Sequence, residues 1–203
     1  HALLAKTLKY SESFGVAVLG VDSSPAPYAE QAGLCGAEYL HVPNEPLPHK
    51  LRAPVMDRVK TPFMFFSADD MFMSGATVEH CLDFLGANPD YASAQGLYFG
   101  VPMDGNRAGL RALYITADNY DNTIDAGAPE ERMLQLFCRY VPTFYAVYRT
   151  ACWQQQMERY PNVIRNYCLF EFFFAMATAI SGKHKILPET YAITYLSLIH
   201  ISQ

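Results

Sequence analysis

The sequence predicts an α/β fold with a mostly parallel central sheet, on the basis of three observations. Strand-like and helix-like segments alternate along the first half of the chain, as in folds built from right-handed strand-helix-strand units. One strand-like run, TPFMFFS at residues 61–67, is apolar almost throughout, which is typical of a strand that helices cover on both faces. The 203 residues, 51% hydrophobic and 17% charged, suit one globular domain with a sizeable core.

The first half of the chain is expected to hold four strands and two helices. The strands are predicted at residues 15–22, 37–43, 61–67 and 91–100, and the helices at residues 50–60 and 74–85. Pro25 and Pro27 end the first strand, because proline cannot donate a hydrogen bond to a strand ladder. Ser74 is of the residue type that caps helix N-termini and stands at the start of the second helix.

The second half has a different pattern. Residues 102–128 are rich in Gly, Asn, Asp and Tyr without periodicity, which predicts a long loop over a site. Helices are expected at residues 129–139, 150–159 and 166–180, and no repeat or linker divides the chain. We therefore expect a single domain at residues 1–195.

The two ends of the sequence look unnatural. The chain begins with His1, already in a helix-like pattern, so an upstream first strand is expected to be missing. Residues 196–201 read LSLIHI, which a widely used sequencing-library adapter gives when translated. We expect residues 196–203 to be a non-native tail, and an ordinary apolar C-terminal strand is the alternative.

Charge and cysteine content exclude some classes of protein. The net charge of −5 and the scattered cations argue against nucleic-acid binding, which needs clustered Lys and Arg. No apolar stretch reaches the ~20 residues of a membrane span. The cysteines are odd in number, widely spaced and mostly among apolar residues, which favours reduced core thiols over disulfides. They are Cys35, Cys81, Cys138, Cys152 and Cys168.

Three acids follow directly on predicted strands. Asp22 ends the first strand, and the adjacent Asp69 and Asp70 follow the third. Ligands of open α/β sheets bind at the carboxyl ends of the strands, so these carboxylates are expected on one rim. Adjacent acids repel unless a cation neutralises them, and Mg²⁺ or Mn²⁺ prefers oxygen ligands and can bridge to phosphates. The pattern favours a divalent metal that holds a diphosphate; alternatively, Asp69 caps a helix and Asp70 is solvated.

A series of short motifs surrounds these acids: VLGVDSS, HVP and then VKTPFMFFSADDMFMSGATVEHCLDFLGANPDY. In order and spacing the series resembles the glycosyltransferase-A families, and especially a bacterial glycosyltransferase-2-like group with a VDSS, TPY, ADDDF and NPDY series. The resemblance covers about residues 2–193. It implies the Rossmann-like fold of the nucleotide-diphospho-sugar transferases.

The resemblance also implies roles for individual residues. Asp22 matches an acid that contacts the nucleobase or ribose of a nucleotide-sugar. Asp69 and Asp70 fall on the motif that binds the metal together with the ribose and diphosphate of the donor. Ser67 stands where many members of the wider family have an Asp, and Met71 where the narrower group has a third acid. Weaker metal dependence and an inactive homologue are both open at this point.

Inverting sugar transfer also requires a carboxylate that takes the proton of the acceptor hydroxyl. Glu171, set among phenylalanines in NYCLFEFFFAMATAISGK, is the expected base, because desolvation raises the pKa of a carboxylate. In the resembling family an acid opens the corresponding helix and a Gly-Lys pair follows, matching Gly182 and Lys183. The alternative is a surface Glu on an otherwise buried helix.

Other charged residues allow two interpretations. Lys50 and Arg52 lie where this type of fold often supplies a cation to the phosphates, and a solvated helix face explains them equally well. Glu130 and Glu131 follow Pro129 and are expected to be first-turn helix acids, which the helix dipole favours.

The expected function is that of a metal-dependent glycosyltransferase, which moves a sugar from a nucleoside diphosphate donor to a hydroxyl acceptor with inversion. A nucleotidyltransferase of similar topology is the alternative enzyme, and a non-catalytic nucleotide- or carbohydrate-binding relative is the third interpretation. The resemblance implies bacterial polysaccharide biosynthesis, with a glycan or other hydroxyl acceptor, in the cytoplasm or peripherally at the inner face of the membrane.

Overall fold

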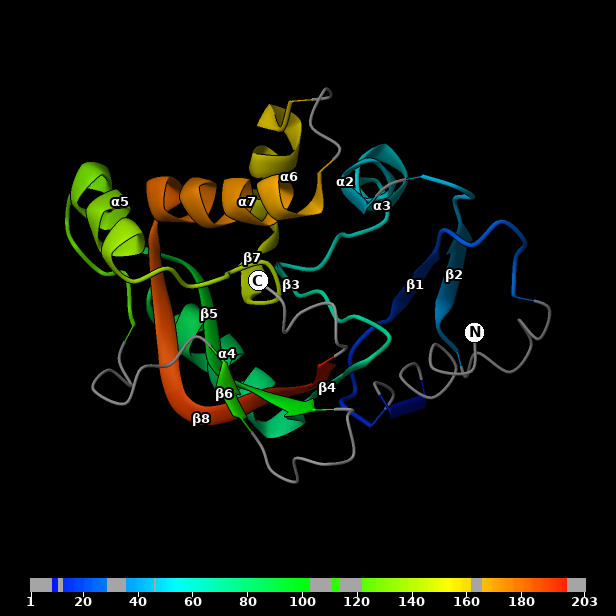
Figure 1. Cartoon of the computed structure of the whole chain (residues 1–203), viewed down its shortest axis with the longest axis horizontal. Coiled ribbons are helices and arrows are strands. Elements are labelled where there is room, and N and C mark those ends of the chain that lie inside the picture. Colours follow the sequence, from blue (N-terminus) through cyan, green and yellow to red (C-terminus); the bar gives the residue numbers. More distant parts are fainter. Residues whose placement is uncertain are drawn as a thin grey trace.

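The computed structural model describes residues 9–10, 13–28, 36–45, 47–102, 111–113, 122–161 and 166–196. These residues form two sheets with helices on both sides of the larger one (Figure 1). The smaller sheet contains β1 (Leu19–Asp22) and β2 (Glu38–His41), which run parallel with Asp22 opposite His41. The first two predicted strands are therefore confirmed, although both are shorter than expected.

The larger sheet has six strands in the order β3-β7-β5-β8-β4, with β6 paired to β5. The strands are β3 (Phe63–Met64), β4 (Met71–Met73), β5 (Tyr91–Pro102), β6 (Arg111–Leu113), β7 (Val147–Arg149) and β8 (Lys183–Leu196). Only the β5–β8 pair is parallel among the described strands of this sheet, and the other pairs are antiparallel. The prediction of a mostly parallel sheet is wrong, because an apolar run shows that a strand is buried and not which way it runs.

The helices form a layer on each side of this sheet (Figure 1). They are α2 (Leu47–Lys50), α3 (Ala53–Met56), α4 (Gly75–Ala87), α5 (Pro129–Cys138), α6 (Thr150–Arg159) and α7 (Tyr167–Ser181). Helix α4 packs its buried face against the sheet in one core cluster, which includes Val78, Cys81 and Leu85. Helices α6 and α7 enclose a second, aromatic cluster on the other side, which includes Trp153 and Phe170.

The long helices agree with the sequence predictions. The Ser74 hydroxyl caps α4 by accepting a hydrogen bond from the backbone N–H of Thr77 at 3.3 Å. Asn166 caps α7 in the same way, through the N–H of Leu169. The single helix predicted at residues 50–60 is wrong: α2 and α3 are separate. A continuous helix would need a hydrogen bond from the nitrogen of Pro54, which has no hydrogen.

Strand β8 was not predicted before residue 196. It pairs with β5 from Tyr91 opposite Lys183 to Pro102 opposite Leu196, with several register shifts. The two strands approach closely at Gly96, where a Cβ atom would lie only 2.9 Å from the Cβ of Tyr191. The sequence of β8 is KHKILPETYAITYL. Its first seven positions contain one proline and four residues that are charged or histidine, and these hide the apolar pattern by which a strand is predicted.

The cysteine prediction is partly wrong. Cys81 is buried and Cys152 is partly buried, and neither forms a disulfide. Cys138 and Cys168 are also reduced, but they are exposed and do not lie in the core. Cys35 lies outside the described residues, as does most of the predicted loop at residues 102–128. Among the described helices, none is long and apolar enough to cross a membrane.

Candidate functional site

Asp22 lies at the carboxyl end of β1, where its two carboxylate oxygens accept hydrogen bonds. The Ser24 backbone N–H and hydroxyl donate to Oδ1 at 2.9 and 2.6 Å, and the Tyr39 hydroxyl donates to Oδ2 at 2.6 Å. Burial raises the pKa of Asp22, but the hydrogen bonds from Ser24 and Tyr39 outweigh burial and leave it below its ordinary value. The side chain therefore stays ionised and fixes the turn after β1.

Asp69 and Asp70 lie in the turn that precedes β4. The backbone N–H of Met71 closes this turn by donating to the carbonyl of Ala68 at 3.2 Å. Asp69 is exposed and Asp70 is half-buried, so the turn presents carboxylate to solvent. Two adjacent oxygen donors at a surface suit Mg²⁺ or Mn²⁺, which keeps several ligands from water and substrate phosphate.

Met71 and Ser67, where the sequence departs from the motif series that it resembles, lie in different environments. Met71 is 4% exposed and belongs to the core cluster under α4, so its side chain points inward. Ser67 is exposed, and its hydroxyl donates to the carbonyl of Ala68 at 3.2 Å. Within the described part of the chain, no group of three or more His, Cys, Asp or Glu residues could hold a metal ion.

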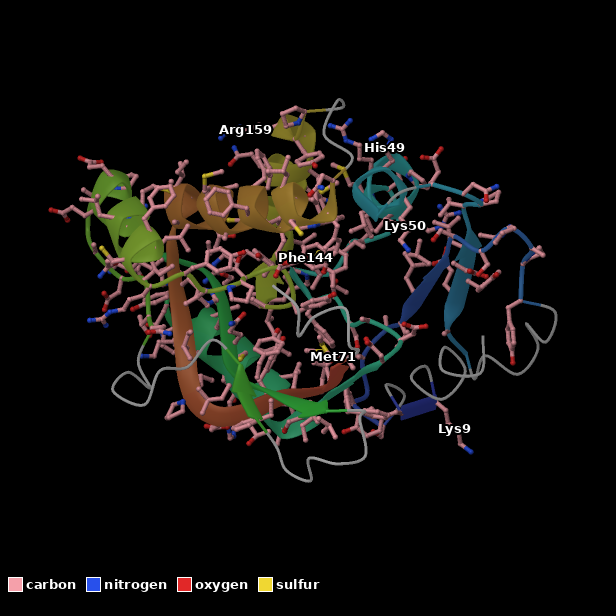
Figure 2. The ribbon with its side chains drawn as sticks, viewed as in Figure 1. Lys9, His49, Lys50, Met71, Phe144 and Arg159 are labelled. Atoms are coloured by element: carbon pink, nitrogen blue, oxygen red, sulfur yellow. The ribbon has the colours of Figure 1, made fainter. Side chains whose placement is uncertain are left out.

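Lys50 connects the acids of the two sheets. Its side chain extends from α2 toward the end of β1 (Figure 2), and its Nζ donates to the Ser23 hydroxyl at 3.2 Å. Burial lowers the pKa of Lys50, and the charges of Asp22 and Asp69 oppose that effect. Lys50 is therefore near enough to Asp22 and to Asp69 for both charges to act on its ammonium group, and we refer to Asp22, Lys50, Asp69 and Asp70 as the rim cluster.

Arg52, the second basic residue of this segment, has a different place. Its guanidinium donates to the carbonyl of Met157 at 3.2 Å and to the carbonyl of Tyr160. Both carbonyls lie at the C-terminal end of α6, where the Tyr160 N–H also donates to the Met157 carbonyl at 3.3 Å. Arg52 therefore stabilises a helix end, whereas Lys50 faces the rim.

Glu171 lies on α7, one helical turn after Tyr167. The side chains of Phe170 and Phe174 on the same helix are fully buried, whereas Glu171 is partly exposed. The sequence predicted a carboxylate embedded among aromatic rings, and in the structure the Glu171 side chain is only partly buried. The hydroxyl of Tyr167 lies 3.1 Å from the hydroxyl of Tyr145, so this face of α7 has polar neighbours.

Aromatic contacts link the Asp69 turn to α7. Phe66, three residues before Asp69, stacks on Phe144 with ring centroids 4.9 Å apart. Phe144 contacts the rings of Phe170 and Phe174 edge-on, at 5.3 and 5.6 Å. The turn that carries the acids and the helix that carries Glu171 therefore pack on one cluster.

The Gly182–Lys183 pair contacts the NPDY motif, residues 88–91, and the residue after it. Lys183 Nζ donates to Asp90 at 2.7 Å and lies 5.5 Å from the ring centroid of Tyr91. A Cβ atom on Gly182 would lie 3.0 Å from the Cβ of Ala92, so the chain passes closely here. These motif residues align the starts of β5 and β8.

The sequence analysis did not assign a role to two residues of this region, Tyr39 and Lys50. Tyr39 was not singled out, although a tyrosine on the strand beside Asp22 is a signal for a buried hydroxyl that needs a partner. Lys50 was left between a phosphate-binding role and a solvated helix face, and in the structure it is half-buried with a hydrogen bond to Ser23.

The fold is similar to solved structures of S. aureus TarS, a glycosyltransferase. TarS 1-349 aligns with a TM-score of 0.61 and 14% identity, over 95% of this chain and 56% of that one. TarS 1-349 in complex with UDP-GlcNAc aligns with a TM-score of 0.65 and 13% identity, over 96% of this chain and 55% of that one. The chain therefore spans about half the length of these structures. No family model and no curated protein matches the sequence.

At these identities the likeness shows the fold, which is glycosyltransferase-A-like. A complex of TarS 1-349 with UDP gives the same result, with a TM-score of 0.58 and 14% identity over 91% of this chain and 52% of that one.

Proposed function

We propose that the chain is a glycosyltransferase domain that moves a sugar from a nucleoside diphosphate donor to a hydroxyl acceptor. The observation that carries the proposal is the rim cluster, in which the charges of Asp22 and Asp69 both act on the ammonium group of Lys50, which donates a hydrogen bond to Ser23. Asp22 lies at the carboxyl end of β1, which is where ligands of open α/β sheets bind. The fold neighbours that bind UDP-GlcNAc and UDP support a nucleotide-sugar as the ligand.

Each residue has a defined part in this proposal. Asp69 and Asp70 hold a divalent metal, which when bound neutralises the charge of the departing diphosphate. Asp22 keeps the turn after β1 in place beside the nucleoside. Glu171 takes the proton from the acceptor hydroxyl. The oxygen of that hydroxyl attacks the anomeric carbon from the face opposite the diphosphate, which leaves, and the configuration of the carbon is inverted.

Isothermal titration with nucleoside diphosphates tests the proposal. We expect UDP or another nucleoside diphosphate to bind more tightly in Mn²⁺ than in EDTA. The double variant Asp69→Asn, Asp70→Asn is expected to lose the gain from metal. Asp83→Asn, which changes an exposed acid on α4, is the matched control and is expected to keep it. A folded protein that binds none of these nucleotides in either buffer would refute the proposal.

A second candidate, a nucleotide-binding relative without transferase activity, is favoured by one observation. Met71 occupies the place of a family acid and is buried in the core. Turnover separates the two candidates: release of UDP from UDP-sugars in the presence of acceptor hydroxyls supports the transferase. Binding of UDP without any release from UDP-GlcNAc or UDP-glucose supports the second candidate.

A further inference from the structure

An apolar surface covers the outer sides of helices α5 and α7, which lie next to each other (Figure 1). Among the described residues, every exposed large apolar side chain except Tyr10 lies on these helices or within two residues of α5. On α7 the apolar residues recur every three or four positions, so they share one side of the helix. We refer to the following residues as the outer face: Leu134, Phe137, Leu169, Phe172, Met176 and Ile180.

The outer face is continuous and open to solvent. Leu134 and Phe137 on α5 are 64% and 58% exposed, and Ile180 on α7 is 51% exposed. The ring centroids of Phe137 and Phe172 lie 6.0 Å apart, and this contact joins the two helices. An apolar groove of about 210 Å³ between α6 and α7 adjoins the face at Met176 and Ile180. A contiguous apolar surface marks a place where another molecule binds, unlike apolar residues that are scattered singly.

Charges of opposite sign lie at the two ends of α5. Glu130 and Glu131 are exposed in its first turn, and Arg139 is exposed directly after its last residue. None of them belongs to an ion pair between described residues. If two copies of α5 lie side by side and antiparallel, the acidic end of each meets Arg139 of the other, with Leu134 and Phe137 in between. The exposed side of α5 is therefore complementary to itself, as a twofold contact requires.

The charges also argue against a membrane as the partner of this surface. Glu130 and Glu131 offset Arg139 and, beside the groove, Arg159. The whole chain has a net charge of −5. Binding to the anionic surface of a membrane needs a cluster of Lys and Arg, which the outer face does not offer among its described neighbours. A second copy of the chain offers both the apolar area and the matching charges.

We propose that two copies of this chain associate through the outer face, with their α5 helices antiparallel about a twofold axis. This inference goes beyond the proposed transferase function and does not depend on it. Parts of two helices make a small contact, so we expect a dissociation constant on the order of 10–100 µM. The chain is then monomeric at the lower concentrations used for unfolding measurements, where Phe137 is exposed as in the single chain.

Sedimentation velocity over about 1–300 µM protein tests the inference. We expect the mass of the wild-type species to rise from that of one copy toward that of two. Leu134→Glu places a carboxylate in the centre of the contact and is expected to stay monomeric over the whole range. Ala87→Glu, which adds the same group at an exposed position on α4, is the control and is expected to match wild type. A monomeric wild type, or equal dimerisation of wild type and Leu134→Glu, would overturn the inference.

Charge reversal tests the antiparallel arrangement. Glu131→Arg and Arg139→Glu are each expected to weaken the dimer about threefold to tenfold, since each acts at two equivalent contacts. The double variant is expected to restore dimerisation. The two positions lie about 12 Å apart along α5, too far to pair within one copy, so restoration needs a contact between copies. In variants with native circular dichroism spectra, a double variant as weak as the single ones, or association beyond two copies, would contradict the proposed dimer.

Discussion

The ring of Phe66 lies parallel to the ring of Phe144, with centroids 4.9 Å apart and an angle of 3° between the planes. Phe66 precedes the turn that carries Asp69, and Phe144 is 2% exposed at the centre of the aromatic cluster under α7. The position of the acidic turn therefore depends on the packing of the core as well as on its own hydrogen bonds.

The variant Phe144→Ala is expected to lower the free energy of unfolding by about 3–5 kcal/mol, because it leaves a cavity among Phe66, Phe170 and Phe174. Urea denaturation followed by circular dichroism measures the change. Phe137→Ala is the control: Phe137 is 58% exposed on α5, so its loss is expected to cost less than about 1 kcal/mol. Similar costs for both variants would contradict the assignment of Phe144 to the core.

The variant Glu171→Gln is expected to lower the rate of sugar transfer by roughly 10²–10⁴-fold, because the amide cannot take a proton from the acceptor. Affinity for the donor is expected to stay within about twofold, since the residue lies on α7 and the donor is proposed to bind at the rim cluster. Steady-state kinetics and titration with UDP measure the two quantities. Glu130→Gln, on an exposed first-turn acid of α5, is the control, and substantial transfer by Glu171→Gln would rule out its role as base.

Two glycine variants are expected to have opposite effects on stability. Gly96→Ala places a methyl group against the backbone of Glu189 and the side chain of Tyr191, which forces β5 and β8 apart and costs about 1–3 kcal/mol or more. Gly86→Ala adds a methyl group in open space on α4 and is expected to stabilise by about 0.4–1 kcal/mol. Urea midpoints measure both. If the Gly96→Ala protein is as stable as wild type, β5 and β8 are farther apart at Gly96 than the structure has them.

Stability is expected to fall on mild acidification because of His184. This side chain is fully buried, its Nδ1 lies 2.8 Å from the Ser93 hydroxyl, and burial lowers its pKa to about 3. The unfolded chain, with a histidine pKa of about 6.5, binds more protons as the pH falls below 6.5. The free energy of unfolding therefore decreases from about pH 6.5 toward pH 3, with a slope of up to about 1.4 kcal/mol per pH unit.

Urea midpoints at about pH 7 and pH 5 measure this effect. The decrease is expected to be smaller in His184→Gln, whose side chain does not titrate. An equal decrease in both proteins would show that other groups cause it.

The sequence predicted the elements whose signals are local. Ser74 and Asn166 begin α4 and α7 as caps, and α6 occupies the predicted residues 150–159. The acids at the end of β1 and before β4 were also found, because a carboxylate directly after an apolar run is visible in the sequence. Their nucleotide-binding and metal-binding roles, and the catalytic role of Glu171, stay predictions.

The features that were missed depend on contacts between distant residues. The antiparallel direction of β3 is set by its pairing with β7, and the run TPFMFFS, which contains β3, carries no mark of it. The strand β8 gains its order from β5, over ninety residues earlier in the chain. Lys50 could be assigned to the rim only once Ser23, twenty-seven residues before it, was placed beside it.

Strand β8 connects the helix of Glu171 with the strand that follows the acidic turn. It begins directly after α7, the helix of Glu171, and it ends in pairs with β4, where Met71 lies opposite Thr194 just after the acidic turn. Helix α7 and strand β4, which follows the acidic turn, are thus both attached to the continuous strand β8 (Figure 1). The separation of α7 from the acidic turn is therefore set by the backbone of β8, and substitutions that leave this strand in place are expected to leave that separation unchanged.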